Sequence, residues 1–148
     1  MIKQKITFAS NTKENLLSGV DKLADIVSST LGPSGHNVIL DLEPGRPVAT
    51  KDGVTIAKAV QLRNPLENVG AQLLKQASIK TGEEAGDGTT TATVLARAIC
   101  IAQSETENFK ASNTVELKAG IDRAAKDVVD YIKSNISKPI SDKTQLKQ

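Results

Sequence analysis

Apolar residues recur every three or four positions along most of this 148-residue chain. That spacing puts them on one face of an α-helix, so it predicts amphipathic helices rather than half-buried strands. The pattern predicts helices over about 13–30, from Asp52 to Val60, over 65–81, over 89–109 and from 114 onward. The chain has only two phenylalanines and one tyrosine, so the core between these helices is expected to consist of Leu, Ile, Val and Ala.

Two short segments break the helical pattern. Ile6 and Phe8 alternate with polar residues in Lys3–Phe8, which predicts a strand. Val38–Leu40 and Pro47–Thr50 flank a turn signal and predict a β-hairpin. A lone hairpin is marginally stable in water, so its edges and the edge of the N-terminal strand are expected to pair with another subunit. The predicted fold class is therefore mainly α: a bundle of long helices with a short N-terminal strand and one β-hairpin.

Composition argues against several classes of function. The net charge is only +2 and few aromatic rings are present to stack on nucleobases, so nucleic acid is not an expected partner. Cys100 is the single cysteine, which excludes an internal disulfide and suits a reducing compartment. No apolar run approaches the length of a transmembrane helix and the N-terminus shows no secretory signal, so no membrane association is expected.

The segment Gly86–Thr91, with the sequence Gly-Asp-Gly-Thr-Thr-Thr, carries the strongest chemical signal. Glycine permits a positive φ and a close approach to a ligand, and the first N–H groups of the following helix have no intrahelical partners. Together with the helix dipole, these groups form an anion site. A carboxylate beside phosphates is repulsive unless a cation lies between them, so Asp87 indicates Mg²⁺. The alternative is that Asp87 only caps the helix. Three consecutive threonines argue against it, because they are poor helix formers and their presence in a first turn suggests a use for their hydroxyls.

Two further segments have a similar character. Thr30–Gly35, with the sequence Thr-Leu-Gly-Pro-Ser-Gly, ends a helix and is either a plain C-terminal cap or part of a ligand loop. Lys51, Asp52 and Gly53 stand where the hairpin meets a short helix. Asp52 either caps that helix or supplies a second carboxylate that orients water against a terminal phosphate. His36 is expected to be a surface turn residue, since the chain has no second histidine to complete a metal site.

In this order and spacing, the three segments resemble the N-terminal part of a group I chaperonin, the GroEL-like family. The resemblance covers the chain from about Ala24 to Ile99. It departs from the family at Ser34 and His36, where the family usually has lysine and arginine. The stretches that match are Thr30-Leu31-Gly32-Pro33, Gly35, Asn37-Val38, Lys51-Asp52-Gly53-Val54, Glu67-Asn68, Gly70-Ala71, Ala85–Ala96, Leu117-Lys118 and Gly120-Ile121-Asp122.

The resemblance implies that residues 1–135 are the N-terminal half of an ATP-binding equatorial domain and that residues 136–148 begin an intermediate domain. It implies ATP and Mg²⁺ as ligands, with K⁺ as a further ion. Asp52 would help to position the attacking water, and Asp87 would hold Mg²⁺. The nucleotide and its phosphates would be bound by residues of all three segments: Thr30, Leu31, Gly32, Pro33, Lys51, Asp87, Gly88, Thr89, Thr90 and Thr91.

The implied function is that of a fragment of an ATP-dependent chaperonin, which assists protein folding in ring assemblies in the bacterial cytoplasm or inside an organelle such as the plastid stroma. Other chaperonin subunits would be its partners, whereas unfolded proteins and the co-chaperonin would bind domains outside these 148 residues. The other wall of the ATP pocket would also lie outside these 148 residues, so the chain alone is expected to hydrolyse little or no ATP. Two alternatives stay open: a stand-alone nucleotide- or phosphate-binding module, and an inactive truncated relic that associates with a full-length chaperonin.

Overall fold

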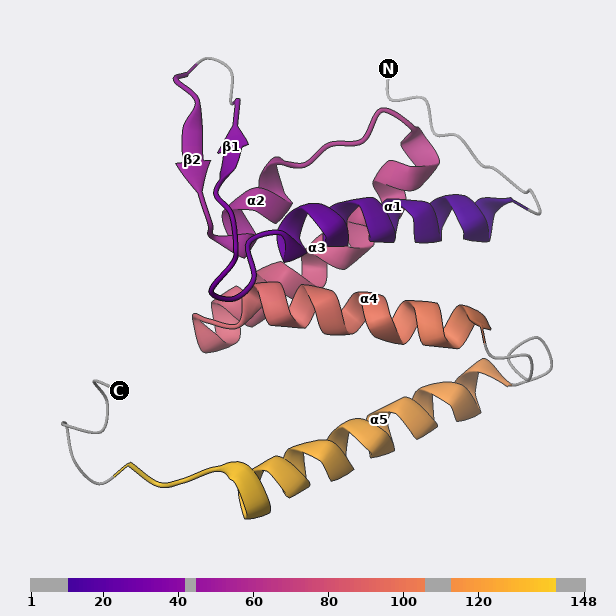
Figure 1. Cartoon of the computed structure of the whole chain (residues 1–148). Coiled ribbons are helices and arrows are strands. Elements are labelled where there is room, and N and C mark those ends of the chain that lie inside the picture. The colour runs from indigo at the N-terminus through magenta and orange to yellow at the C-terminus, as the bar shows by residue number, and fades with distance from the viewer. Residues whose placement is uncertain (1–10, 42–44, 106–112, 141–148) are drawn as a thin grey trace. The chain divides into compact units, whose positions relative to one another are not determined.

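The computed structural model describes residues 11–41, 45–105 and 113–140, and these are mainly helical (Figure 1). The chain divides into two compact units, residues 1–106 and 107–148. The predicted fold class of helices with one hairpin is confirmed, whereas the strand expected at Lys3–Phe8 lies outside the described residues. The first unit contains α1 (Thr12–Ser28), β1 (Val38–Leu40), β2 (Val48–Thr50), α2 (Gly53–Ala59), α3 (Pro65–Ala85) and α4 (Thr89–Glu105); the second contains α5 (Thr114–Tyr131) and the π-helical turn η2 (Ile132–Ile136).

Asparagine side chains begin two of the long helices. Asn64 accepts a hydrogen bond from the Leu66 N–H at 3.0 Å, and Pro65 occupies the first position of α3. Asn113 accepts from the Val115 N–H at 3.0 Å and begins α5 in the same way. Each side chain satisfies one of the N–H groups that a helix leaves without an internal partner, so these two starts are where the sequence places them.

Helix α3 runs past its predicted end near residue 81 and stops at Ala85. Thr81 and Gly82 are tolerated within the helix, and the Thr81 hydroxyl donates to the carbonyl of Ala77 at 2.8 Å. The helix ends instead at Gly86, which has a left-handed φ of 73° and whose N–H donates to the Gly82 carbonyl at 3.1 Å. A glycine after the last turn is a stronger stop signal than a glycine within it, because only the left-handed conformation turns the chain away.

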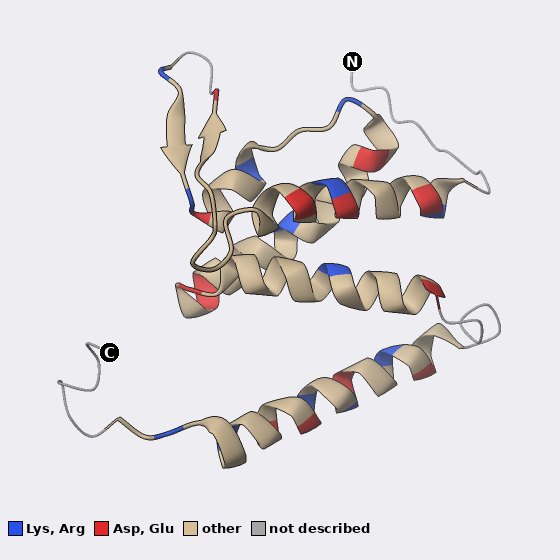
Figure 2. Ribbon diagram, in the orientation of Figure 1, with Lys and Arg blue, Asp and Glu red and all other residues tan. Residues whose placement is uncertain are grey.

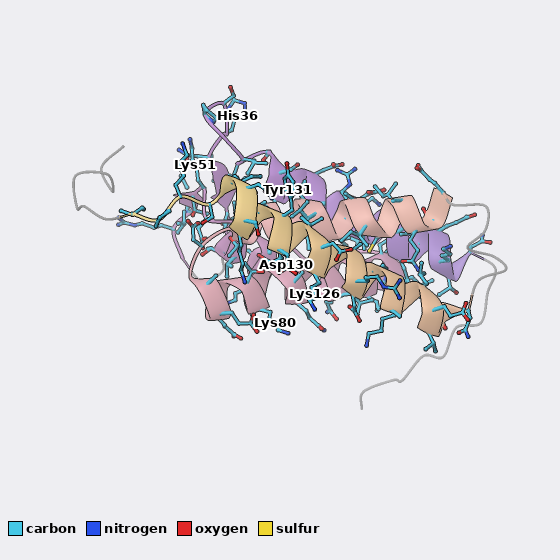
Figure 3. All side chains as sticks on the ribbon, turned by 90° about the horizontal axis from the view of Figure 1, so that it is seen from below. His36, Lys51, Lys80, Lys126, Asp130 and Tyr131 are labelled. Carbon is cyan, nitrogen blue, oxygen red and sulfur yellow. The ribbon has the colours of Figure 1, made fainter. Side chains whose placement is uncertain are left out.

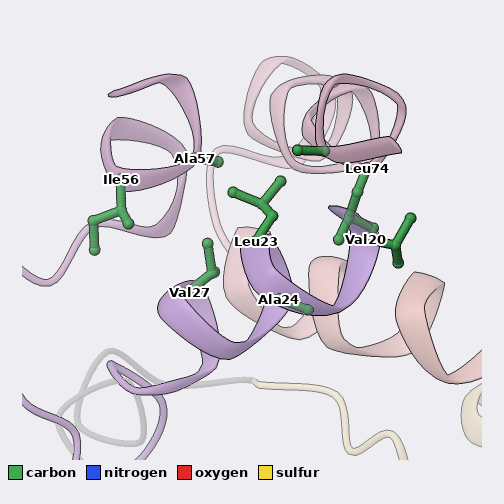
Figure 4. Close-up of a cluster of buried hydrophobic side chains, with 8 residues drawn as sticks. Val20, Leu23, Ala24, Val27, Ile56, Ala57 and Leu74 are labelled. Atoms are coloured by element: carbon green, nitrogen blue, oxygen red, sulfur yellow. The ribbon is translucent and has the colours of Figure 1, made fainter. Parts of the chain in front are cut away.

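Among the described residues of the first unit, the buried hydrophobic side chains are all aliphatic, in line with the shortage of aromatic residues in the sequence. Helices α1, α3 and α4 lie side by side, and α2 packs across one end of α1 and α3 (Figure 1). Half of the buried cluster comes from α1, so this helix is the centre of the packing (Figure 4). The buried residues of the cluster are Val20, Leu23, Ala24, Val27, Ile56, Ala57, Ala71 and Leu74.

Helices α1 and α3 approach each other closely through two glycines. Gly19 of α1 lies against the backbone of Glu67, and Gly70 of α3 lies against the backbone of Leu16. A Cβ atom at either glycine would overlap the backbone of the opposite helix. The close crossing brings the aliphatic side chains on either side of it into contact, and dispersion between such closely packed atoms is strong in sum.

Ion pairs tie α1 to both of its neighbours. The Lys22 ammonium lies 2.6 Å from a carboxylate oxygen of Glu67 on α3, which holds the pKa of Glu67 below its usual value. Arg97 of α4 bonds to Asp21 at 2.7 Å and to Asp25 at 2.8 Å. These pairs are partly exposed, so they fix the register of the helices more than they stabilise the fold.

The hairpin leads directly into one of the predicted ligand segments. Its two strands are antiparallel, and Leu40 of β1 is buried while Ile39 is 72% exposed. At the end of β2, the Thr50 hydroxyl accepts a hydrogen bond from the Asp52 N–H at 3.0 Å. The end of β2 therefore adjoins the candidate site. The paired residues are Val38 with Thr50, Ile39 with Ala49 and Leu40 with Val48.

The described residues of the second unit include α5 and η2, and α5 has no buried residue. Figure 2 shows basic and acidic residues mixed along α5, so it offers no face of a single charge. Neither α5 nor any other helix in the described part of the chain is long and apolar enough to cross a membrane.

The packing predicts a clear difference between two identical substitutions. Leu23→Ala removes a side chain that is 0% exposed and should lower the free energy of unfolding by about 2–5 kcal/mol, because the core cannot fully collapse around the cavity. Leu73→Ala, at a position that is 55% exposed, is the matched control and should cost about 1 kcal/mol or less. Urea denaturation followed by circular dichroism measures both. Equal losses in the two variants would contradict the assigned core.

Candidate phosphate-binding site

The turn between α3 and α4 contains two glycines in the left-handed conformation. Gly86 has a φ of 73° and Gly88 a φ of 75°, values that side-chain-bearing residues rarely adopt. Between them, Asp87 is exposed, and its Oδ1 atom accepts a hydrogen bond from the N–H of Gly88 at 2.6 Å. The glycines thus fold the loop tightly around a single solvent-facing carboxylate.

The first turn of α4 presents backbone donors beside this carboxylate. The first bond of the helix runs from the Ala92 N–H to the Gly88 carbonyl at 2.9 Å, so the N–H groups of Thr89, Thr90 and Thr91 precede it. Asp87 bonds to Gly88 and not to these donors, so the structure does not show it capping α4. Donors of this kind, at the positive end of a helix dipole, favour an anion.

Asp52 is the N-cap of α2, as the simpler of its two interpretations predicts. Its Oδ2 atom accepts from the Thr55 N–H at 2.9 Å and also from the Thr55 hydroxyl. The hydroxyl bond is the largest of the causes that lower the pKa of Asp52. The carboxylate is therefore ionised at neutral pH while it remains beside the candidate site. Sequence reasoning missed Thr55, although the Asp-x-x-Thr spacing, in which a polar side chain follows an N-cap by three residues, is a signal that could have identified it.

The two loops meet at Gly53. This glycine is buried, and a Cβ atom there would overlap the Thr90 hydroxyl and lie 3.1 Å from the Thr89 hydroxyl. Segments almost forty positions apart in the sequence are in this way brought into contact at the N-termini of α2 and α4.

A hollow of about 310 Å³ opens where the loops meet. Residues from all three segments predicted from the sequence line this hollow. The exposed Lys51 lies at the same end of the unit as His36 (Figure 3). The hollow thus combines one cation, two carboxylates and the first turn of α4. It is lined by Leu31, Lys51, Asp52, Gly53, Asp87, Gly88, Thr89, Thr90 and Thr91.

Three of the predicted ligand residues do not line this hollow. Thr30 is buried, and its hydroxyl donates to the carbonyl of Val27 at 2.7 Å, so its side chain serves the end of α1. Gly32 has a left-handed φ of 75°, and Pro33 is exposed beside it. From the first segment, only Leu31 reaches the hollow, where it adds an apolar surface that is 48% exposed.

The carboxylates of the hollow suit a metal ion that is shared with phosphates. Among the described residues, no group of three or more histidine, cysteine, aspartate or glutamate side chains could hold a metal by itself. Asp52 and Asp87 nevertheless line the same hollow. Mg²⁺ characteristically binds one or two carboxylates and completes its octahedron with phosphate oxygens and water, so the donor set fits Mg²⁺ accompanied by a phosphate ligand.

Beside this geometry, the amino-acid sequence of the chain matches a known family. The model of the TCP-1/cpn60 chaperonin family matches residues 23–148, and the chain belongs to that family. It is 46% identical over 150 aligned residues to the protein named Chaperonin GroEL 2 from Cereibacter sphaeroides, and equally to the protein of that name from a particular strain of the species. The match covers 99% of this chain and 27% of each relative, so the chain spans about a quarter of their length.

The capping contact of Asp52 predicts a pH-dependent contribution to stability. Asp52→Ala should lower the free energy of unfolding at neutral pH by about 1 kcal/mol, since an N-cap is lost. The folded-state pKa of Asp52 is depressed, so this contribution is present above the unfolded-state pKa of about 3.9 and declines as the pH falls through the folded-state value.

Urea denaturation of wild type and variant across an acid pH series measures this difference. Asp41→Ala, at an exposed position between the strands, is the matched control for loss of an aspartate and should change stability little at any pH. A loss for Asp52→Ala that stays constant down to strongly acid pH would show that the carboxylate charge has no part in the cap.

Proposed function

We propose that this chain binds the phosphates of ATP together with Mg²⁺, as part of a chaperonin that uses ATP hydrolysis to assist the folding of other proteins. The observation that supports the proposal most strongly is the convergence of Lys51, Asp52 and Asp87 with the first turn of α4 on one hollow. A triphosphate is polyanionic and needs hydrogen-bond donors and positive charge around it. The first turn of α4 offers the donors, Lys51 offers one positive charge, and the two carboxylates offer ligands for Mg²⁺.

The phosphates are proposed to lie against the first turn of α4. There the N–H and hydroxyl groups of Thr89, Thr90 and Thr91 donate hydrogen bonds, and the helix dipole adds a partial positive charge. Lys51 contributes a full positive charge from the opposite loop. Leu31 offers an apolar contact for the nucleoside. The chemistry of the hollow therefore selects the phosphate end of the nucleotide more strongly than the base.

The two carboxylates have separate proposed roles. Asp87, exposed between two left-handed glycines, would hold Mg²⁺, which in turn would neutralise charge on the phosphates. Asp52 would orient the water that attacks the terminal phosphorus, forming a new P–O bond as the bond to the ADP leaving group breaks. A carboxylate with a lowered pKa is a weak proton acceptor, so Asp52 is expected to act by orientation and electrostatics rather than by taking the proton.

The remaining parts of the proposal follow from family membership. Residues 1–135 would form half of an equatorial domain and 136–148 the start of an intermediate domain, with the other wall of the ATP site supplied from outside these residues. The exposed hairpin would pair with another subunit of a ring, in the cytoplasm of a bacterium or inside an organelle. Unfolded proteins and a co-chaperonin would bind elsewhere in the assembly.

The role of Asp87 predicts a metal-dependent response to ATP. When Mg·ATP is titrated into the ¹⁵N-labelled chain, the amide resonances of Gly88, Thr89, Thr90 and Thr91 should shift, with weak affinity on the order of millimolar because only one wall is present. In Asp87→Asn the dependence of these shifts on Mg²⁺ should disappear, while Asp41→Asn should behave as wild type. Shifts that are absent at millimolar Mg·ATP, or identical in Asp87→Asn, would rule out the proposed site.

The role of Lys51 predicts a preference for long phosphate chains. Lys51→Met should weaken binding of Mg·ATP about tenfold, because a charge-assisted hydrogen bond is lost, and should leave binding of AMP nearly unchanged. Lys80→Met is the matched control, since Lys80 is exposed on α3 and pairs with Glu84 at 3.7 Å. The same titration measures all three proteins. Equal weakening for AMP and ATP in Lys51→Met would place the lysine away from the terminal phosphates.

A further inference from the structure

Helix α2, which carries Asp52 at its start, is held at both ends. Its first residue, Gly53, packs against the Thr90 hydroxyl of α4. At its other end, the ammonium of Lys75 on α3 donates to the carbonyl of Val60 and lies 3.4 Å from that of Lys58. Lys75 thus places a cation at the C-terminal end of the helix dipole, where it is stabilising. The backbone position of Asp52 is fixed by these contacts, and the main freedom left is the rotation of its side chain.

Thr55 removes that freedom with two bonds to one oxygen. Its N–H donates to Oδ2 of Asp52 at 2.9 Å, which is the ordinary bond of an N-cap. Its hydroxyl donates to the same Oδ2, which capping does not require. Oδ1 carries neither bond. Asp52 lines both the candidate site and a neighbouring hollow of about 310 Å³, whereas Thr55 lines neither. Thr55 is therefore placed to act on a bound ligand through its contact with Asp52.

We propose that Thr55 is a positioning residue, whose hydroxyl holds the Asp52 carboxylate in one rotamer so that Oδ1 faces the attacking water. The inference rests on the proposed function, in which Asp52 orients that water. The charged groups that line the two hollows beside Asp52 are Lys51, Lys58, Glu83 and Asp87. None of them forms a salt bridge with Asp52 in the described part of the chain, so the Thr55 hydroxyl is the side-chain partner that sets the carboxylate's orientation.

The test uses one substitution that removes the hydroxyl and one that retains it. Thr55→Val keeps the backbone N–H and the branched shape but deletes the hydroxyl, and Thr55→Ser keeps the hydroxyl. Thr81→Val is the matched control, because its hydroxyl bonds to a carbonyl within α3. Three-bond NMR couplings in the chain report the χ1 rotamer of Asp52. ATP hydrolysis is measured on the ring assembly that contains the chain, with kcat and KM determined separately.

The proposal expects a single Asp52 rotamer in wild type, Thr55→Ser and Thr81→Val, and averaged couplings in Thr55→Val. It also expects Thr55→Val to lower kcat at least about tenfold with KM for Mg·ATP nearly unchanged, since misorientation of a catalytic group is costly. A single rotamer in Thr55→Val would overturn the proposal, as would an unchanged kcat. If the wild-type assembly hydrolyses no ATP, the proposed function fails, and the couplings still decide whether Thr55 positions Asp52.

Discussion

The N-termini of α2 and α4 meet where Gly53 packs against the hydroxyls of Thr89 and Thr90, and a Cβ atom at Gly53 would overlap the Thr90 hydroxyl. The contact sets the distance between the loop that carries Lys51 and Asp52 and the loop that carries Asp87. If the helices were further apart, the residues of the two loops would no longer line one hollow. The arrangement of charge around a ligand thus depends on one residue that has no side chain of its own.

Helix α1 connects the aliphatic core to the helices that meet at this contact. Helix α1 supplies half of the buried cluster and crosses α3 closely through Gly19 and Gly70. It is tied to α4 by the two bonds of Arg97. The elements that end at the site are therefore parts of one packed body, and the ligand groups are held by helix termini rather than by loops alone. Sites supported by rigid elements keep their geometry before a ligand arrives.

The charges that line the hollow suit a phosphate accompanied by a divalent cation better than a free anion. Lys51 and the N–H groups of α4 attract phosphate, whereas Asp52 and Asp87 repel it. The mixture is unfavourable for a bare anion and favourable once a divalent cation lies between the carboxylates and the phosphates. Membership of the TCP-1/cpn60 chaperonin family is consistent with the proposed ATP site.

Most of the fold is predictable from the sequence, because apolar periodicity and asparagine caps are local signals. The starts of α3 and α5 follow from Asn64 and Asn113, while the end of α3 was misplaced because Gly82 competes with Gly86 as a stop signal. At the site, the sequence identifies the three segments but not their relative geometry. The Asp-x-x-Thr spacing points to Thr55 as a partner of Asp52, but the rotamer that brings its hydroxyl to Oδ2 is set by the fold. The bond of the Thr30 hydroxyl to the Val27 carbonyl likewise depends on a side-chain rotamer.

The most direct test of the central claim is a crystal structure of the chain with Mg²⁺ and an unhydrolysable ATP analogue. Terminal phosphates are expected against the N–H groups of Thr89, Thr90 and Thr91, with Mg²⁺ between them and Asp87 and with Lys51 beside them. Nucleotide bound away from this turn, or phosphates in the hollow with no metal at Asp87, would contradict that claim.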